Sequence, residues 1–377
     1  MKILFVCENY HPHYGGAEVL FKNLAEGLVK KGHRVAVITT QLPETRKYEE
    51  INGVKVHRIN CFNNRYLFSF LSIPKVLKLA RKADLIQTTT FNGAPPAWLG
   101  AKLTKKPVAL TVHEVWIGKW KEITGFSWIQ STLHDLLERI IYIFPFDKYV
   151  CVSQATRKDL LKQGIKSDKV VTVHNGFDYK FWDSKKFSHN KAQQLRKELD
   201  LEKKFVCLAW GRPGSSKGFQ YLIKAAPSIQ QKIPNAAILL MLGSPEKYQQ
   251  NYHHLKRLTR RQQHIVKIIP SLPYQELGTI IKAADCVIIP SLSEGFGYNA
   301  LETNSLGTPL IVSDAGSLPE VVSGKYLFFR SKDIQDLAEK IVLAAKRKYH
   351  HTPLKRFEWE DCIQGYLRAY AELLRDS

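Results

Sequence analysis

The stretch CVIIPSLSEGFGYNALE, residues 286–302, reads as a buried strand, a glycine-containing turn and the start of a helix. Its first five residues are apolar without alternation, which is typical of a strand in a parallel sheet covered on both faces. Glu294 lies in the turn, and Glu302 lies about a turn and a half into a helix that begins near Gly297. A strand that passes directly into a helix indicates an α/β architecture.

The same alternation of strand and helix runs along the whole chain. Apolar runs predict strands at residues 2–7, 34–40, 54–59, 84–90, 107–113, 148–153, 169–174, 205–210, 237–242, 265–269, 286–290, 309–313 and 326–329. Amphipathic stretches predict helices that include residues 17–31, 73–82, 154–163, 219–231, 275–284, 298–306 and 334–347. This order predicts two doubly wound domains with parallel sheets, joined by the polar stretch 178–204.

The length of 377 residues also favours two domains, because a domain commonly holds about 100–200 residues. We predict an N-terminal domain of residues 1–180, a C-terminal domain of residues 181–358 and a final segment of residues 359–377. That segment contains an amphipathic helix, which either caps the second domain or crosses back to the first.

Lys and Arg outnumber Asp and Glu by 56 to 34, which gives a net charge of +22. The basic excess is spread over both predicted domains, so the chain has no detached basic tail. Nucleic acid, an anionic membrane surface and phosphorylated substrates are all compatible with this charge. No nucleic-acid-binding module is recognisable, and we expect no nucleic acid partner.

The cysteines occur singly, without the paired spacing of a zinc site or a disulfide framework, at Cys7, Cys61, Cys151, Cys207, Cys286 and Cys362. We expect them to be core or half-buried residues. The apolar run at the start is too short for a signal peptide, and no stretch approaches 18 apolar residues. We therefore expect a cytoplasmic protein, with the inner face of the cytoplasmic membrane as an alternative location.

Two other predicted strand ends carry residues suited to an anion. Gly15 and Gly16 precede a helix, whose free N–H groups and dipole favour negative charge, although a simple tight turn explains the pair equally well. Arg212 and Lys217 flank a Gly/Ser turn at another helix start, an arrangement suited to a diphosphate. A pair of solvated surface cations is the alternative. Neither turn has the glycine spacing of a nicotinamide or nucleoside-triphosphate loop.

The turn after residue 290 adds donors and acceptors to this set. The backbone amides of Gly295, Phe296 and Gly297 would hold a phosphate or sugar oxygen at the start of the helix. The Glu294 and Glu302 carboxylates would accept hydrogen bonds from hydroxyl groups. The three strand ends together predict a ligand that contains both phosphate and hydroxyl groups.

These residues resemble the signature of family-4 retaining glycosyltransferases of the GT-B fold, the glycosyl transferases group 1. The resemblance rests on the two glutamates with seven residues between them and on the Pro-Ser and Glu-Gly-Phe-Gly that surround the first. It extends along the chain through GGAE at 15–18, TVHE at 111–114, NGFD at 175–178, GR at 211–212 with KG at 217–218, GTP at 307–309 and DAGSLPE at 314–320.

The resemblance implies two Rossmann-like domains that face each other across a cleft. The second domain would bind most of a nucleotide-diphosphate sugar, and the first would bind the acceptor. Arg212 and Lys217 would hold the diphosphate. Glu302 would accept from the ribose hydroxyls, and Glu294 would bind hydroxyls of the transferred sugar.

The remaining assignments also come from the resemblance. The Phe296 and Gly297 amides would point at sugar or phosphate oxygens, and Gly16 would approach the diphosphate from the first domain. His113 would lie next to the sugar, although a strand-end histidine held by a backbone hydrogen bond is the simpler explanation. The chain has no Asp-x-Asp motif, so we expect no metal and no other cofactor.

The activity implied is that of a retaining hexosyltransferase using a UDP- or GDP-sugar. Its acceptor would be a glycan or a lipid-linked molecule, in cell-surface polysaccharide, lipopolysaccharide or glycolipid biosynthesis. Front-face transfer, the commoner view for the family, and a covalent intermediate on Glu294 both remain open. Tyr298 and Asn299 depart from the family's usual residues and leave the donor open. A non-catalytic sugar-nucleotide-binding relative and a basic nucleic-acid-binding protein are the alternatives.

The segment 116–146 combines three Trp residues with Ile, Phe, Lys and Arg. This composition is typical of a membrane interface, which predicts a peripheral contact with an anionic membrane. The alternative for residues 136–146 is a helix that buries its apolar side chains in the core of the first domain.

Overall fold

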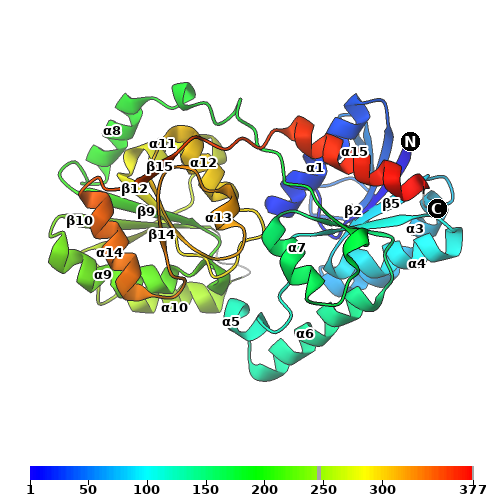
Figure 1. The fold of residues 1–377 in the computed structure, drawn as a ribbon, viewed down its shortest axis with the longest axis horizontal. Coiled ribbons are helices and arrows are strands. Elements are labelled where there is room, and N and C mark those ends of the chain that lie inside the picture. Colours follow the sequence, from blue (N-terminus) through cyan, green and yellow to red (C-terminus); the bar gives the residue numbers. More distant parts are fainter. Residues whose placement is uncertain (244–247, 376–377) are drawn as a thin grey trace. The chain divides into compact units, whose positions relative to one another are not determined.

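The computed structural model describes residues 1–243 and 248–375. The chain divides into two units, each with its own sheet (Figure 1). Unit 1 holds residues 1–118, 130–177 and 357–377, and unit 2 holds residues 119–129 and 178–356. The predicted boundary at residues 180 and 181 lies three residues beyond Phe177, where the first unit gives way to the second. Residues 244–247 and 376–377 of the predicted segments lie outside the described residues.

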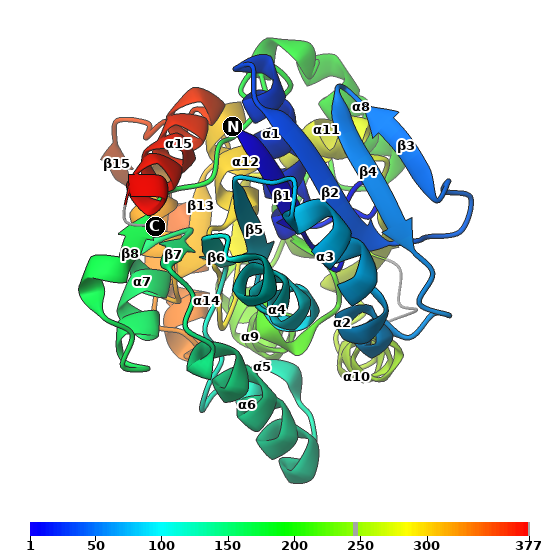
Figure 2. The ribbon, with the colours of Figure 1, turned by 90° about the vertical axis from the view of Figure 1, so that its right-hand side faces the viewer.

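Unit 1 contains an eight-stranded sheet with the order β3-β4-β2-β1-β5-β6-β7-β8. Its strands are β1 (Lys2–Val6), β2 (Arg34–Thr40), β3 (Tyr48–Ile51), β4 (Val54–Ile59), β5 (Leu85–Thr89), β6 (Val108–Val112), β7 (Lys148–Cys151) and β8 (Val170–Thr172). Its helices are α1 (Gly16–Lys30), α2 (Phe68–Leu71), α3 (Ile73–Ala80), α4 (Ala94–Thr104), α6 (Trp128–Ile143), α7 (Gln154–Leu161) and α15 (Trp359–Arg375). Figure 2 shows this unit from the side of α3, α4 and α6.

Unit 2 contains a seven-stranded sheet with the order β11-β10-β9-β12-β13-β14-β15. Its strands are β9 (Phe205–Gly211), β10 (Ala236–Leu242), β11 (Val266–Pro270), β12 (Cys286–Ile289), β13 (Leu310–Ser313), β14 (Gly324–Phe329) and β15 (His350–Thr352). Its helices are α5 (Trp120–Thr124), α8 (His189–Glu198), α9 (Phe219–Lys232), α10 (Gln249–Thr259), α11 (Leu277–Ala283), α12 (Tyr298–Leu306), α13 (Leu318–Val321) and α14 (Ile334–Ala345).

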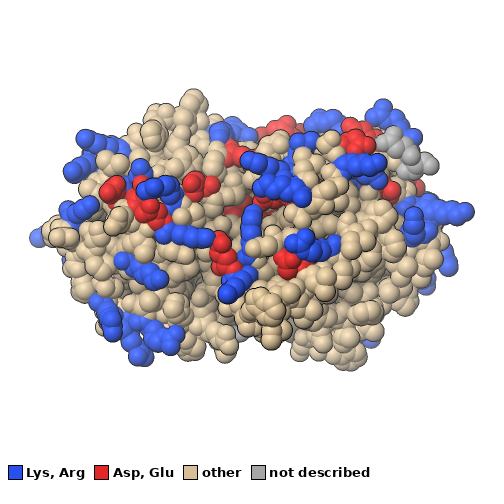
Figure 3. Space-filling view, turned by 60° about the horizontal axis from the view of Figure 1, so that its bottom comes forward, with Lys and Arg blue, Asp and Glu red and all other residues tan. Residues whose placement is uncertain are grey.

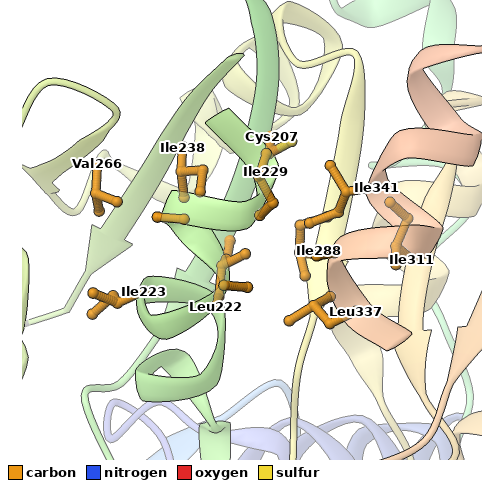
Figure 4. Packing of buried hydrophobic residues seen from close by; sticks show 14 of the residues in the cluster. Cys207, Leu222, Ile223, Ile229, Ile238, Val266, Ile288, Ile311, Leu337 and Ile341 are labelled. Carbon is orange, nitrogen blue, oxygen red and sulfur yellow. The ribbon is translucent and has the colours of Figure 1, made fainter. Parts of the chain in front are cut away.

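The core of unit 2 forms where α9 and α14 lie on the sheet. Leu222 and Ile229 of α9 and Leu337 of α14 are fully buried against strand residues such as Ile288 and Ile311 (Figure 4). Burying a side chain of this size contributes roughly 1.5–3 kcal/mol. This packing fixes the carboxyl ends of β9, β12 and β13 relative to one another.

Both sheets confirm the predicted doubly wound architecture, with one difference at their edges. β3 and β15 run antiparallel to β4 and β14, whereas the other neighbouring strands pair in parallel. Edge strands of this kind are short and polar, so they lack the apolar run by which the buried strands are recognised.

The C-terminal helix α15 belongs to unit 1, the second of the two positions that the sequence left open. The hydroxyl groups of Tyr366 and Thr111 lie 2.8 Å apart, and the Tyr370 hydroxyl donates to Gln87 Oε1 at 2.9 Å. A Cβ atom at Gly27 of α1 would lie 2.2 Å from Ile363 Cδ1. The glycine therefore allows α15 to approach α1 closely.

The prediction that residues 178–204 form a linker is wrong. This stretch contains α8 and packs on unit 2, where Trp182 is buried and its Nε1 donates to the Tyr274 hydroxyl at 3.0 Å. Arg196 of α8 forms an ion pair of 3.1 Å with Asp285. The stretch is polar because α8 covers the surface of unit 2 and buries one face only.

Residues 119–129 lie in unit 2, although the sequence analysis placed them in the N-terminal domain. Ser215 donates to the carbonyl of Thr124 at 3.1 Å, and Lys332 pairs with Glu122 at 2.6 Å. The six cysteines are buried, as expected, and their thiols are free. None of the helices in residues 1–243 and 248–375 is long and apolar enough to cross a membrane.

Candidate donor site

The candidate site of unit 2 lies where its strand order changes direction. The chain adds β10 and β11 on one side of β9 and then returns to place β12 and β13 on the other side. The carboxyl ends of β9 and β12, which lie on either side of this change, are the usual ligand position in such sheets. Residues 212–218 follow β9, and residues 290–297 follow β12.

Backbone hydrogen bonds hold these loops to each other and to the loop after β13. The amide of Leu292 donates to the Ser216 carbonyl at 2.7 Å. Both the amide and the hydroxyl of Ser317 donate to the Glu294 carbonyl at 3.0 Å. The position of Glu294 is thus set by the loops on either side of it.

Two glycines allow the loops to come this close. Gly218 has a φ of +65°, and a Cβ atom there would lie 1.8 Å from the Pro290 carbonyl oxygen. Gly316 has a φ of +56°, and its Cβ atom would lie 2.4 Å from the Glu294 carbonyl oxygen. Neither position has room for a side chain, and both backbone conformations favour glycine.

Lys217 and Glu294 form the centre of the candidate site. Lys217 Nζ lies 2.5 Å from Glu294 Oε1, and the Ser291 hydroxyl donates to the same oxygen at 2.9 Å. Both charged side chains are mostly buried. Because a charge-assisted hydrogen bond is strong when partly shielded from water, this pair holds the Lys217 ammonium at the carboxyl end of β12.

Glu302 is a buried carboxyl that feels the charge of Lys217. Burial raises the pKa of its carboxyl to about 8, while the positive charge of Lys217 and a hydrogen bond with the Trp210 side chain oppose the rise. Near pH 7 the Glu302 carboxyl is therefore mainly protonated. A protonated carboxyl can donate one hydrogen bond and accept others, so it suits a pair of hydroxyl groups.

The other predicted residues of unit 2 surround this centre. Arg212 follows β9 and is exposed, and no ion pair joins its guanidinium to another residue within 1–243 or 248–375. Gly295, Phe296 and Gly297 are buried in the turn before α12. Gly297 has a φ of +89° and caps the helix, so the amides that follow it lie at a helix N-terminus.

The residues predicted in unit 1 lie at the carboxyl ends of its strands. Gly15 is the N-cap of α1, and Gly16 is its first residue. The side chain of Glu18 folds back over Gly15, where a Cβ atom would lie 2.4 Å from Glu18 Oε2. Glu18 Oε1 lies 3.0 Å from His13 Nδ1. The start of α1 is therefore held by a carboxylate of its own first turn.

His113 follows β6, as predicted. Its carbonyl accepts from the Thr156 hydroxyl at 3.0 Å, and its ring meets Phe21 edge to face. Its Nε2 atom is buried, with no hydrogen bond partner among the residues described. Burial lowers the pKa of His113 to about 4, and the nearby negative charge of Glu18 offsets part of this shift. The imidazole is neutral at pH 7 and has one ring nitrogen available for a ligand.

The structure thus brings Lys217, Glu294 and Glu302 together in unit 2, and it places His113 with Glu18 in unit 1. The sequence did not identify Ser291 or Glu18 as site residues. Glu18 lies in the GGAE motif, so its position at the first turn of a helix was the available signal. The only sequence signal for Ser291 was its position at a strand end, and many residues with a purely structural role share that position.

Across the described residues, no group of three or more His, Cys, Asp and Glu side chains could hold a metal ion. The cationic side chains among the predicted residues of unit 2 are Lys217 and Arg212.

Comparison with known families divides the chain in the same way. Residues 14–181 match Glycosyltransferase Family 4, and residues 190–356 match the Glycosyl transferases group 1. An uncharacterized glycosyltransferase of Methanocaldococcus jannaschii is 28% identical over 85% of this chain and 83% of its own length. The alpha-monoglucosyldiacylglycerol synthase of Streptococcus pneumoniae is 23% identical over 93% of this chain and 80% of its own length.

Solved structures with the same fold include Anabaena HepE in complex with UDP-glucose. The likeness has a TM-score of 0.75, covers 99% of this chain and 100% of HepE, and has 20% sequence identity. At this identity the likeness establishes the arrangement of helices and strands. The two sheets described above follow the fold of that protein.

Proposed function

Because the chain is a family-4 glycosyltransferase with the GT-B fold, we propose that it transfers a hexose from a nucleotide-diphosphate sugar to a glycan or lipid-linked acceptor. The observation that supports this most strongly is that Lys217, at the switch point of unit 2, pairs with Glu294 and exerts its positive charge on the buried carboxyl of Glu302. A cation beside two carboxyl groups matches a donor that carries both phosphate and hydroxyl groups.

In this proposal Lys217 and Arg212 bind the diphosphate. Negative charge grows on the leaving phosphate as the bond from the anomeric carbon breaks, and positioned cations stabilise that charge. Lys217 is held in place before the donor arrives, since Glu294 and the loop contacts fix it. Arg212 is exposed and reaches the diphosphate from the surface.

Glu302 binds the ribose hydroxyls and Glu294 binds the transferred sugar. The contacts that Glu294 makes with Lys217 and Ser291 both involve Oε1. We assign Oε2 to a sugar hydroxyl. The Gly295, Phe296 and Gly297 backbone amides supply further donors at the start of α12.

The residues of unit 1 are assigned to the sugar and acceptor side. The neutral ring of His113 donates or accepts one hydrogen bond through Nε2, which has no partner among the described residues. Gly15 and Gly16 present the N-terminus of α1 to an anionic group. These assignments give a role to the Nε2 atom of His113, unpartnered within the described part of the chain, and to the glycine pair at the start of α1, neither of which the fold itself requires.

We propose that transfer retains the configuration of the sugar and proceeds on one face, without a metal. The bond between the anomeric carbon and the diphosphate oxygen breaks, and the acceptor oxygen forms a bond to that carbon. The acceptor proton passes to the leaving phosphate, which becomes the base. Glu294 is then a binding residue, because its Oε1 is engaged with Lys217.

UDP is the first nucleotide to test, because HepE is solved with UDP-glucose. A lipid acceptor is supported by the similarity to the Streptococcus pneumoniae synthase. Assembly of a cell-surface polysaccharide, lipopolysaccharide or glycolipid, with a cytoplasmic site of action, stays a prediction, as does use of a GDP-sugar.

The test is a transfer assay with radiolabelled UDP- and GDP-sugars and a panel of lipid and glycan acceptors, in the presence of EDTA. We expect one donor to give a product. Lys217→Ala should abolish formation of this product, whereas Lys224→Ala, which changes an exposed residue of α9, should retain it. Equal products from the two variants would contradict the assignment of Lys217. A product with inverted configuration would contradict the proposed stereochemistry.

A further inference from the structure

Helix α6 turns its polar side toward the rest of unit 1. Glu138 is 1% exposed and accepts from the Trp116 amide at 3.0 Å. Asp135 accepts from the Gly118 amide and pairs with Arg139 at 2.7 Å. These carboxylates attach the helix to the loop that follows β6.

The opposite side of α6 is an exposed apolar stripe. We define the α6 stripe as residues 133, 136, 137, 140 and 143, which are Leu133, Leu136, Leu137, Ile140 and Ile143. Leu136 is 54% exposed and Ile143 is 73% exposed. The spacing of three and four residues places all five along one face of the helix. The alternative that residues 136–146 bury their apolar side chains is therefore correct for Ile141, Tyr142 and Phe146, and in part for Phe144, which packs against the same core.

The neighbouring helices of unit 1 carry a basic surface. Residues 54–106 contain ten Lys and Arg residues and a single acidic residue, Asp84. The segment includes α3 and α4, which pack against each other. Lys78 of α3 and Lys102 of α4 are exposed. We call the exposed Lys and Arg residues of this segment the basic surface.

The basic surface and the α6 stripe belong to one side of unit 1. Trp98 of α4 stacks on Phe144, directly after α6, with ring centroids 4.8 Å apart. Figure 2 shows α3, α4 and α6 on the side that faces the viewer. Leu103 of α4 is 64% exposed. Figure 3 shows large uncharged areas of the surface, with Lys and Arg and fewer Asp and Glu side chains scattered among them.

We propose that this side of unit 1 docks on an anionic lipid bilayer, with the α6 stripe inserted among the lipids and the basic surface held at the headgroups. An amphipathic helix that lies in the interface buries its apolar face at the boundary between headgroups and acyl chains. Basic residues beside it add attraction to anionic lipid.

Charge favours a bilayer over a second copy of the chain as the occupant. The chain carries +22, so two copies that meet through this basic side repel each other. An anionic membrane has the complementary charge. The inference does not depend on the proposed transfer reaction, because binding to vesicles needs neither donor nor acceptor.

The experiment measures co-sedimentation of the full chain with vesicles of phosphatidylcholine containing phosphatidylglycerol, and with vesicles of phosphatidylcholine alone. Two matched variants test the stripe. Leu136→Gln lies on it, and Leu354→Gln changes a leucine of unit 2 that is 58% exposed. We expect Leu136→Gln to weaken binding to anionic vesicles about tenfold, since one leucine leaves the apolar contact. Leu354→Gln should bind like the unchanged protein.

A second pair of variants tests the charge. Lys78→Glu with Lys102→Glu reverses two charges of the basic surface, and Lys224→Glu with Lys232→Glu makes the same change on α9. We expect the first pair to lose most binding at low salt and the second pair to lose little. Circular dichroism checks that each variant is folded.

Three results would overturn the proposal. Binding to anionic vesicles that is equal for Leu136→Gln and Leu354→Gln would show that the stripe does not insert. Equal binding to neutral and anionic vesicles would remove the role of charge. A dimer in sedimentation experiments that Leu136→Gln dissociates, without any vesicle binding, would make a second copy the occupant.

Discussion

Replacing Glu302 by Gln should change how the stability of the protein depends on pH. Burial raises the pKa of this carboxyl from 4.5 to about 8 in the folded protein. The folded state therefore holds the proton more tightly than the unfolded state between these values, and stability falls as pH rises through this window. At pH 7 the cost is about 3 kcal/mol, because each pH unit above 4.5 contributes about 1.4 kcal/mol.

Glu302→Gln removes this cost, since the amide is neutral at every pH and similar in shape to the protonated acid. We expect the variant to match the unchanged protein below pH 4.5 and to exceed its free energy of unfolding by about 3 kcal/mol at pH 7. Above pH 8 the difference should stop growing. Urea unfolding at pH 5, 6, 7 and 8 measures it, with exposed Glu339→Gln of α14 as the control.

Parallel stability curves for Glu302→Gln and the unchanged protein across this pH range would refute the reasoning. They would mean that the Glu302 carboxyl is ionised in the folded state. Its role as a partly protonated acceptor of hydroxyl groups would then have to be abandoned.

Two further predictions concern the same loops. Gly218→Ala should unfold unit 2 at lower urea than Gly307→Ala, because both glycines have positive φ but only the first would place a Cβ atom against the Pro290 carbonyl. Equal midpoints in urea unfolding would contradict the close packing. Lys217→Ala should lower the rate of transfer more than it weakens donor binding, whereas Glu302→Ala should chiefly weaken donor binding. Steady-state kinetics separates the two effects, and unchanged values for both variants would rule out their assigned roles.

The sequence predicted most of the fold because buried strands and amphipathic helices carry clear patterns. β12 and α12 are found where the apolar run and the glycine turn predicted them, and α12 has the predicted bounds. β3 and β15, with sequences YEEI and HHT, lack an apolar run. α8 is too polar to stand out from a linker, although it packs on unit 2.

The structure also shows long-range contacts and helix orientations that no local sequence pattern predicts. Lys217 and Glu294 are 77 residues apart in sequence, so their contact follows from the order of the strands and not from spacing. Periodicity identifies α6 as amphipathic but does not say which side faces the protein. Its acidic residues face inward because backbone amides of the loop after β6 need acceptors there.

The raised pKa of Glu302 is another feature that the local sequence does not predict. Its place in the motif predicted that it is near the ligand, and its burial follows only from the packing of α12 on unit 2. The same limit applies to His113, whose buried ring nitrogen follows from the surroundings of β6.

The most direct test of the account is calorimetric binding of UDP, GDP and ADP in the presence of EDTA, with the unchanged protein and with Lys217→Ala and Arg212→Ala. We predict that one diphosphate binds without a metal, that it stabilises the protein by about 2.7 kcal/mol at a hundredfold excess over its dissociation constant, and that both variants weaken it. A diphosphate that binds all three proteins equally, or that binds only when a divalent metal is added, would contradict the donor site described above.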